Sequence, residues 1–85
     1  MVEVGRTAVS ILLKRNRASL VILAADASEK LKKEIELECI KKHVPVYIFS
    51  NKVELGKLFG RDELGAIAVS NKNLADGIAR ALNLP

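Results

Sequence analysis

Segments that read as strands alternate with segments of helical periodicity along the whole chain. Continuous apolar runs are typical of strands that are covered on both faces of a sheet. Leu20–Ala24 is such a run, and Pro45–Phe49 and Leu64–Ser70 have a similar character. The short segment Val2–Val4, which Gly5 closes, is a further candidate. The pattern therefore predicts strands in these positions.

A helix is predicted after each of the first two strands. The first covers residues 6–16, where Val9, Leu12 and Leu13 recur at helical spacing. The second begins after Ser28, because serine is a good N-cap, and it ends near residue 43. Residues spaced four apart give this second helix an inner stripe, which consists of Leu31, Ile35 and Cys39.

Two more helices are predicted in the second half of the chain. One is capped by Ser50 or Asn51 and runs through Phe59, where Gly60 can take the left-handed conformation that ends helices. The last begins after Asn71 or Asn73 and ends near the C-terminus. Its spacing predicts an inward face made of Leu74, Ile78, Ala81 and Leu82.

The predicted order of elements is βαβαβαβα. Strands separated by helices need crossover connections, which favour a largely parallel or mixed sheet with helices on both sides. We therefore expect an α/β fold, namely a three-layer α/β/α sandwich around a central four-stranded mixed sheet. The length of 85 residues fits one domain over residues 1–85.

Composition excludes several classes of protein. Hydrophobic residues make up 49% of the chain and charged residues 28%, which is typical of a soluble globular domain. No apolar run approaches the roughly 20 residues of a membrane span, and the N-terminus does not resemble a secretory signal. The single cysteine, Cys39, excludes an internal disulfide. A reducing, cytoplasmic location is the expectation.

The basic residues are concentrated near the N-terminus. The whole chain has a formal net charge of +4. Within residues 1–24, Glu3 is the acidic side chain that opposes four basic ones, Arg6, Lys14, Arg15 and Arg17. Clustered cations favour nucleic acid, because they release counterions from phosphates. An ordinary solvated basic surface is the alternative interpretation.

Enzyme and metal motifs are missing from the sequence. There is no dinucleotide-binding or Walker glycine pattern, and Cys39 with His43 offers at most two metal ligands. Asp26 follows a predicted strand, where functional groups often lie, but stabilising its own loop is the commoner role. We expect a noncatalytic protein without a cofactor or metal.

The strongest candidate site is the start of the first helix. Gly5, Arg6 and Thr7 combine free backbone N–H groups, the positive end of a helix dipole and a guanidinium, which together suit a phosphate. Lys14 and Arg15 lie further along the same predicted helix and could follow a nucleic-acid backbone. No aromatic platform for stacking single-stranded bases lies near.

The segment Val4-Gly5, the helix after it, and Ala18 to Ser28 resemble the kink-turn RNA-binding ribosomal protein family, the L-seven-Ae and L-thirty-e group. A second block is also similar: Val44 to Ile48, then Glu54-Leu-Gly-Lys-Leu-Phe-Gly60, then Gly65 to Val69. The stretch Ala-Ser-Glu-Lys-Leu-Lys-Lys at residues 27–33 is similar to the bacterial branch of this family.

The resemblance implies a ribosome- or RNP-associated protein that recognises structured, kink-turn-like RNA. It implies that the helix start after Gly5 contacts the RNA, assisted by the loops at residues 26–29 and 60–65. It also matches Gly60 to the loop glycine of the family and Arg15 to a basic position near the end of the recognition helix. The expected RNA-binding residues are therefore Gly5, Arg6, Thr7, Lys14, Arg15, Gly60 and Arg61.

Three positions of the helix differ from the pattern of the tight kink-turn binders. Where these carry an Asn-Glu pair and then a lysine, this chain has Thr7, Ala8 and Ile11. The helical spacing predicts that Ile11 points outward. A protein partner or a second copy of the chain, bound through Ala8 and Ile11, is the alternative function. The family's usual helix before the first strand is also missing, which would leave one face of the sheet less covered and favour self-association.

Overall fold

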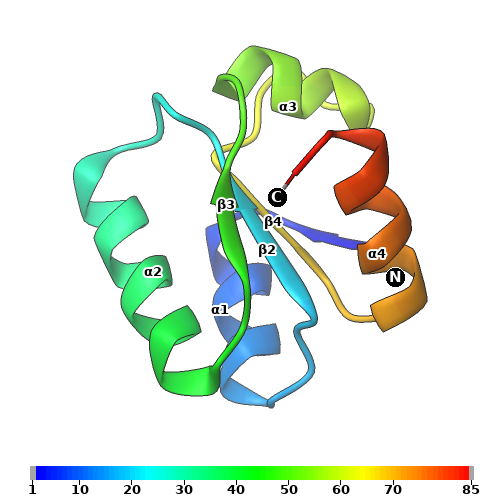
Figure 1. Ribbon diagram of the computed structural model, residues 1–85. Helices are drawn as coiled ribbons and strands as arrows, with labels where there is room; N and C mark the ends of the chain where they lie inside the picture. Colours follow the sequence, from blue (N-terminus) through cyan, green and yellow to red (C-terminus); the bar gives the residue numbers. More distant parts are fainter. Residues whose placement is uncertain (1, 85) are drawn as a thin grey trace.

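The computed structural model describes residues 2–84 and has the predicted order of elements, βαβαβαβα. Figure 1 shows these elements along the chain. The strands are β1 (Val2–Val4), β2 (Leu20–Leu23), β3 (Val46–Ile48) and β4 (Ala66–Val69). The helices are α1 (Arg6–Lys14), α2 (Glu29–Lys42), α3 (Lys52–Leu58) and α4 (Lys72–Ala81).

The strands form one mixed sheet in the order β1-β4-β2-β3. Strand β4 lies between β1 and β2 and is antiparallel to both, while β2 and β3 are parallel. The mixed sheet is thus confirmed, although most of its pairings are antiparallel. Because β4 runs against its neighbours, its amino end lies beside the carboxyl ends of β1 and β2.

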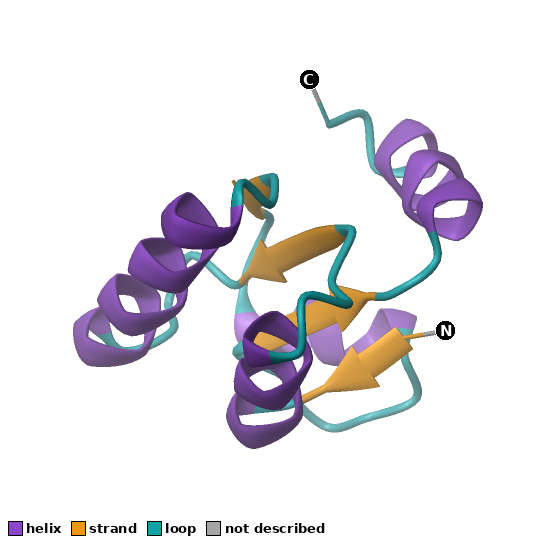
Figure 2. Ribbon diagram, turned by 90° about the horizontal axis from the view of Figure 1, so that it is seen from below, coloured by secondary structure: helices purple, strands orange, loops and turns teal. Residues whose placement is uncertain are grey.

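Two hydrophobic clusters fill the space on the two faces of the sheet. On one face, α1 and α2 pack Val9, Leu13, Ile35 and Cys39 against the sheet, and each of these side chains is buried. On the other face, Leu55 of α3 and Ala75 of α4 join a second cluster. Figure 2 shows α1 and α2 on one side of the sheet and α4 on the other. The predicted three-layer α/β/α sandwich is confirmed.

The predicted caps account for the helix boundaries. The Ser28 hydroxyl accepts a hydrogen bond from the backbone N–H of Leu31 at 3.1 Å, and His43 ends α2 in the left-handed conformation. The Asn51 and Asn71 side chains cap α3 and α4 in the same way. Gly60 follows α3 with a φ of +70°, as expected of a glycine that ends a helix.

The predicted inward face of α4 is partly wrong. Ile78 and Leu82 pack against the second cluster, but Leu74 is 40% exposed and Ala81 is exposed as well. The residue that is buried in their place is Ala75, which lies three positions before Ile78. Ala75 directly follows Leu74, so the face of α4 that contacts the sheet is rotated by about one residue from the predicted face.

Candidate functional site

Three segments that are far apart in the sequence meet at one end of the sheet. The backbone N–H of Gly5 donates to the carbonyl of Ala66 at 3.0 Å, and that of Ala24 donates to the carbonyl of Gly65 at 2.9 Å. These two hydrogen bonds bring the start of α1 and the β2–α2 loop to opposite sides of the segment that enters β4. We call this end, formed by residues 5–7, 25–29 and 60–65, the loop face.

Gly5 gives α1 an abrupt start. Its φ of 91° and ψ of 160° lie in a region that is essentially open only to glycine. The next three residues have no earlier helical carbonyl to bond, so their backbone N–H groups point out of the helix end. The first turn contains no acidic side chain that would neutralise the positive end of the helix dipole. The site is therefore suited to an anion such as phosphate.

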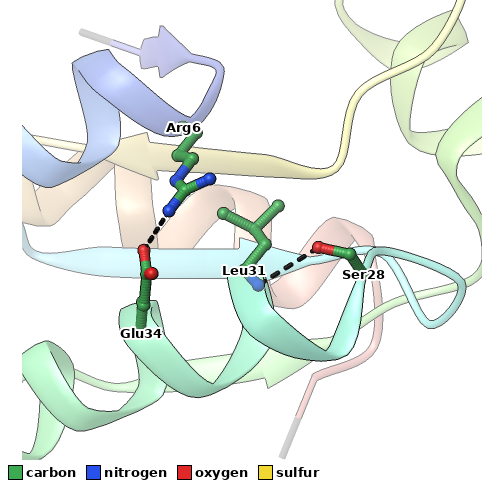
Figure 3. Close-up of polar contacts among 4 residues, drawn as sticks. All are labelled: Arg6, Ser28, Leu31 and Glu34. Atoms are coloured by element: carbon green, nitrogen blue, oxygen red, sulfur yellow. Dashed lines mark hydrogen bonds and ion pairs between the residues drawn. The ribbon is translucent and has the colours of Figure 1, made fainter.

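Two exposed side chains flank this helix start. Arg6 reaches across to α2 and forms an ion pair with Glu34, which Figure 3 shows together with the Ser28 cap of α2. Thr7, in contrast, is exposed and has its hydroxyl directed at no partner in the described part of the chain. The guanidinium of Arg6 thus lies at the edge of the site with much of its charge already balanced.

The α3–β4 loop is held close to α3. The backbone N–H of Arg61 donates to the carbonyl of Gly56 at 2.9 Å, and a Cβ atom placed on Gly56 would lie 2.7 Å from the Cα atom of Glu63. Only glycine permits this approach. Gly60 and the exposed Arg61 lie in this loop, which continues through Asp62 into Gly65.

Asp26 has a role that the sequence did not suggest. Its Oδ1 atom accepts a hydrogen bond from the backbone N–H of Lys52 at 2.7 Å, so it holds the first turn of α3 rather than its own loop. The Lys32 ammonium, from α2, donates to the carbonyl of Ala25 in the loop that contains Asp26, at 2.9 Å. Both hydrogen bonds join the β2–α2 loop to a helix, and no local pattern in the sequence predicts them.

The expected RNA-binding residues fall into two groups. Gly5, Arg6, Thr7, Gly60 and Arg61 all belong to the loop face. Lys14 and Arg15 are exposed at the opposite end of α1, about 12 Å along the helix axis from Arg6 at about 1.5 Å per residue.

The outer surface of α1 separates the two groups of residues. Ile11 is 46% exposed on this surface, as its predicted outward direction requires. It lines a shallow hollow together with Ala8 and Arg15. An apolar side chain therefore occupies the middle of a helix face whose two ends are polar.

Residues 2–84 contain no group of three or more metal-ligating side chains that could hold an ion. Cys39 is buried, and burial together with the carboxylates of Glu36 and Glu38 raises the pKa of its thiol to about 11. It is accordingly a packing residue and a poor nucleophile at neutral pH. None of the described helices is long and apolar enough to cross a membrane.

The fold and the loop face together define a small protein of the α/β/α sandwich class. The sequence matches the family model of the ribosomal protein L7Ae/L30e/S12e/Gadd45 family over residues 2–78, and the chain belongs to this family. Family membership indicates an RNA-binding protein of the ribosome or of another ribonucleoprotein.

One solved structure shows how well the fold is preserved. It is that of a protein with unknown function from Bacillus halodurans C, and it matches with a TM-score of 0.89 at 26% sequence identity. The match covers 96% of this chain and 83% of the other. No curated protein matches the sequence.

Proposed function

We propose that residues 1–85 act as one noncatalytic RNA-binding domain in the cytoplasm, on the ribosome or in another ribonucleoprotein. The loop face recognises structured RNA of the kink-turn type. The observation that carries this proposal is the pair of backbone hydrogen bonds from Gly5 and Ala24 to the segment that enters β4, at 3.0 and 2.9 Å. They bring a helix start and two loops onto one continuous surface.

The chemistry of this surface favours contacts to the RNA backbone over contacts to bases. The N–H groups after Gly5 and the guanidinium of Arg61 bind phosphate, and the Thr7 hydroxyl bonds to phosphate or ribose. Ala8 offers no carboxylate or amide to a base edge. Affinity then depends mostly on phosphate neutralisation, and it falls steeply as salt is raised.

The experiment compares the binding of a kink-turn RNA and of a plain RNA duplex of equal length, each at two salt concentrations. We expect the kink-turn RNA to bind more tightly, and both affinities to fall as salt increases. Equal affinity for the two RNAs under all conditions would contradict the proposal.

Two arginine variants locate the preference. Arg61→Ala removes a guanidinium from the loop face and is expected to lower the ratio of the two affinities. Arg80→Ala removes the same group from an exposed position on α4, outside the loop face, and is expected to leave that ratio unchanged. If Arg61→Ala does not alter the ratio of kink-turn to duplex affinity, the loop face does not recognise the kink-turn.

The exposure of Ile11 favours one alternative. An isoleucine that is 46% exposed beside Ala8 offers an apolar contact where a phosphate ligand would need a cation. In this second function the outer surface of α1 binds a protein partner or another copy of the chain. Such binding would respond little to salt and would be lost in Ile11→Lys.

A further inference from the structure

The end of the molecule opposite the loop face carries two adjoining hollows. One is lined by Asn16, Arg17 and Ser70, among others, and the second by Lys42, His43 and Lys72. Ala18 and Ser19 belong to both linings, so the hollows lie side by side. In Figure 1 this is the lower end, where α1 and α2 finish and α4 begins.

Basic side chains gather around these hollows from α2, from α4 and from the segment that follows α1. We call this surface the basic end; it is made of Arg17, Lys42 and Lys72 from these two linings and of Arg15 from a third hollow that shares Arg17. Within residues 2–84, neither arginine nor Lys42 takes part in an ion pair, whereas Lys72 pairs with Asp76 at 3.6 Å. Glu3 and Asp76 are the acidic side chains in the same linings. Basic groups therefore exceed acidic ones at this end.

The loop face lacks a comparable excess. Arg6 is paired with Glu34, and Lys52 lies 3.8 Å from the carboxylate of Glu63. Arg61 is followed directly by two exposed acids, Asp62 and Glu63. The four N-terminal cations that the sequence groups together are thus separated in space, and two of them, Arg15 and Arg17, belong to the basic end.

Helix dipoles do not account for this arrangement. Lys42 lies in the last turn of α2 and Arg15 caps α1, where cations stabilise the negative helix ends. Arg17, however, lies beyond the end of α1, and Lys72 occupies the first turn of α4, where a cation is unfavourable. The ion pair with Asp76 offsets this cost at Lys72, whereas Arg17 has neither a helix end nor an ion-pair partner within residues 2–84, and a bound polyanion would supply one.

We propose that the basic end is a second RNA-binding surface, which contacts the phosphates of an RNA helix without reading its sequence. The charges are spread over two adjoining hollows rather than focused in one pocket, as suits a continuous backbone better than a small anion. This proposal extends the proposed function. A kink-turn on the loop face and a helix on the basic end would place two RNA segments on opposite ends of one small protein.

The test measures binding of a plain RNA duplex over a range of salt concentrations. The double variant Arg17→Gln/Lys42→Gln removes two cations from the basic end. Lys33→Gln/Arg80→Gln is the matched control, because it removes one lysine and one arginine that are exposed and line neither hollow. We expect the first variant to weaken duplex binding about tenfold at low salt and to reduce the slope of log affinity against log salt by about 2.

Equal losses in the two variants, or no loss in the first, would overturn the proposal. Thermal unfolding of both variants checks that the fold is retained. The preference for kink-turn RNA over duplex gives an independent readout, because the loop face carries it. If the wild-type protein shows no preference for kink-turn RNA but Arg17→Gln/Lys42→Gln still weakens duplex binding, the proposed function is overturned. The basic end then remains as the RNA-binding surface.

Discussion

Arg6 and Glu34, which are 28 residues apart in the sequence, form an ion pair that joins the first turn of α1 to α2. Both side chains are about half exposed, so the pair contributes less than about 1 kcal/mol to stability. Its main effect is on charge. It places a carboxylate beside the helix start that is the candidate phosphate site.

Removing that carboxylate should strengthen RNA binding. Glu34→Gln frees the Arg6 guanidinium, and we expect a severalfold gain in affinity for kink-turn RNA at low salt with little change in unfolding temperature. Glu36→Gln is the control, because it removes the same charge from the same helix at an exposed position. Equal gains in the two variants would mean that net charge, and not Arg6, is responsible.

Two glycine-to-alanine substitutions should change stability in opposite directions. A Cβ atom on Gly5 or on Gly77 meets no atom within 4 Å, so neither substitution creates a clash. Gly5→Ala forces alanine to a φ of +91° and should cost about 1–3 kcal/mol. Gly77→Ala, inside α4, should stabilise by about 0.5–1 kcal/mol. Urea unfolding measures both, and the same sign for the two would contradict this account.

The stability of the protein should fall at high pH through Cys39. Its pKa is raised in the folded state from 9.0 to about 11, so between these values the unfolded thiol loses its proton while the folded one keeps it. The free energy of unfolding that this group contributes is present below pH 9 and is lost as the pH rises toward 11.

The Cys39→Ala variant isolates this effect from every other source of alkaline destabilisation. Urea unfolding at several pH values should give a weaker alkaline loss in the variant than in wild type. Thiol alkylation should be slow in the folded protein and fast in urea, because the side chain is buried. Rapid alkylation of the folded protein would show that the site opens.

Ile11→Lys distinguishes the two candidate functions by the sign of its effect. The side chain is exposed, so the substitution should leave stability within about 0.5 kcal/mol of wild type. If RNA is the ligand of α1, the added cation should tighten binding at low salt. If a protein or a second copy binds there, the substitution should abolish that complex. Pull-down, sedimentation and RNA titration of one variant compare these outcomes.

Local patterns in the sequence predict most of the fold. The caps at Ser28 and Gly60 depend on neighbouring residues only, and the buried run of β2 is visible as a continuous apolar segment. The direction of β4 was not predictable in the same way, because an αβ connection allows it to enter the sheet in either sense. The face of α4 was misassigned at Leu74 because spacing fixes the period of a helix and not its rotation against the sheet.

The candidate site could be predicted only in part. Gly5 and the exposure of Ile11 follow from local conformation and spacing, and both are found in the structure. The partners of Arg6 and Asp26 lie 28 and 26 residues away, so only the folded chain reveals them. The same is true of the gathering of Arg17, Lys42 and Lys72, which no single segment contains.

The hydrogen bond from the Lys52 backbone to Asp26 has a consequence for how the loop face meets a ligand. It links the β2–α2 loop to the start of α3. At the other end of α3, the close approach of Gly56 to Glu63 holds the α3–β4 loop against the helix. The β2–α2 and α3–β4 loops are therefore held in place before a ligand binds. Little conformational entropy remains to be lost on association, which compensates for a surface that offers few polar groups to bases.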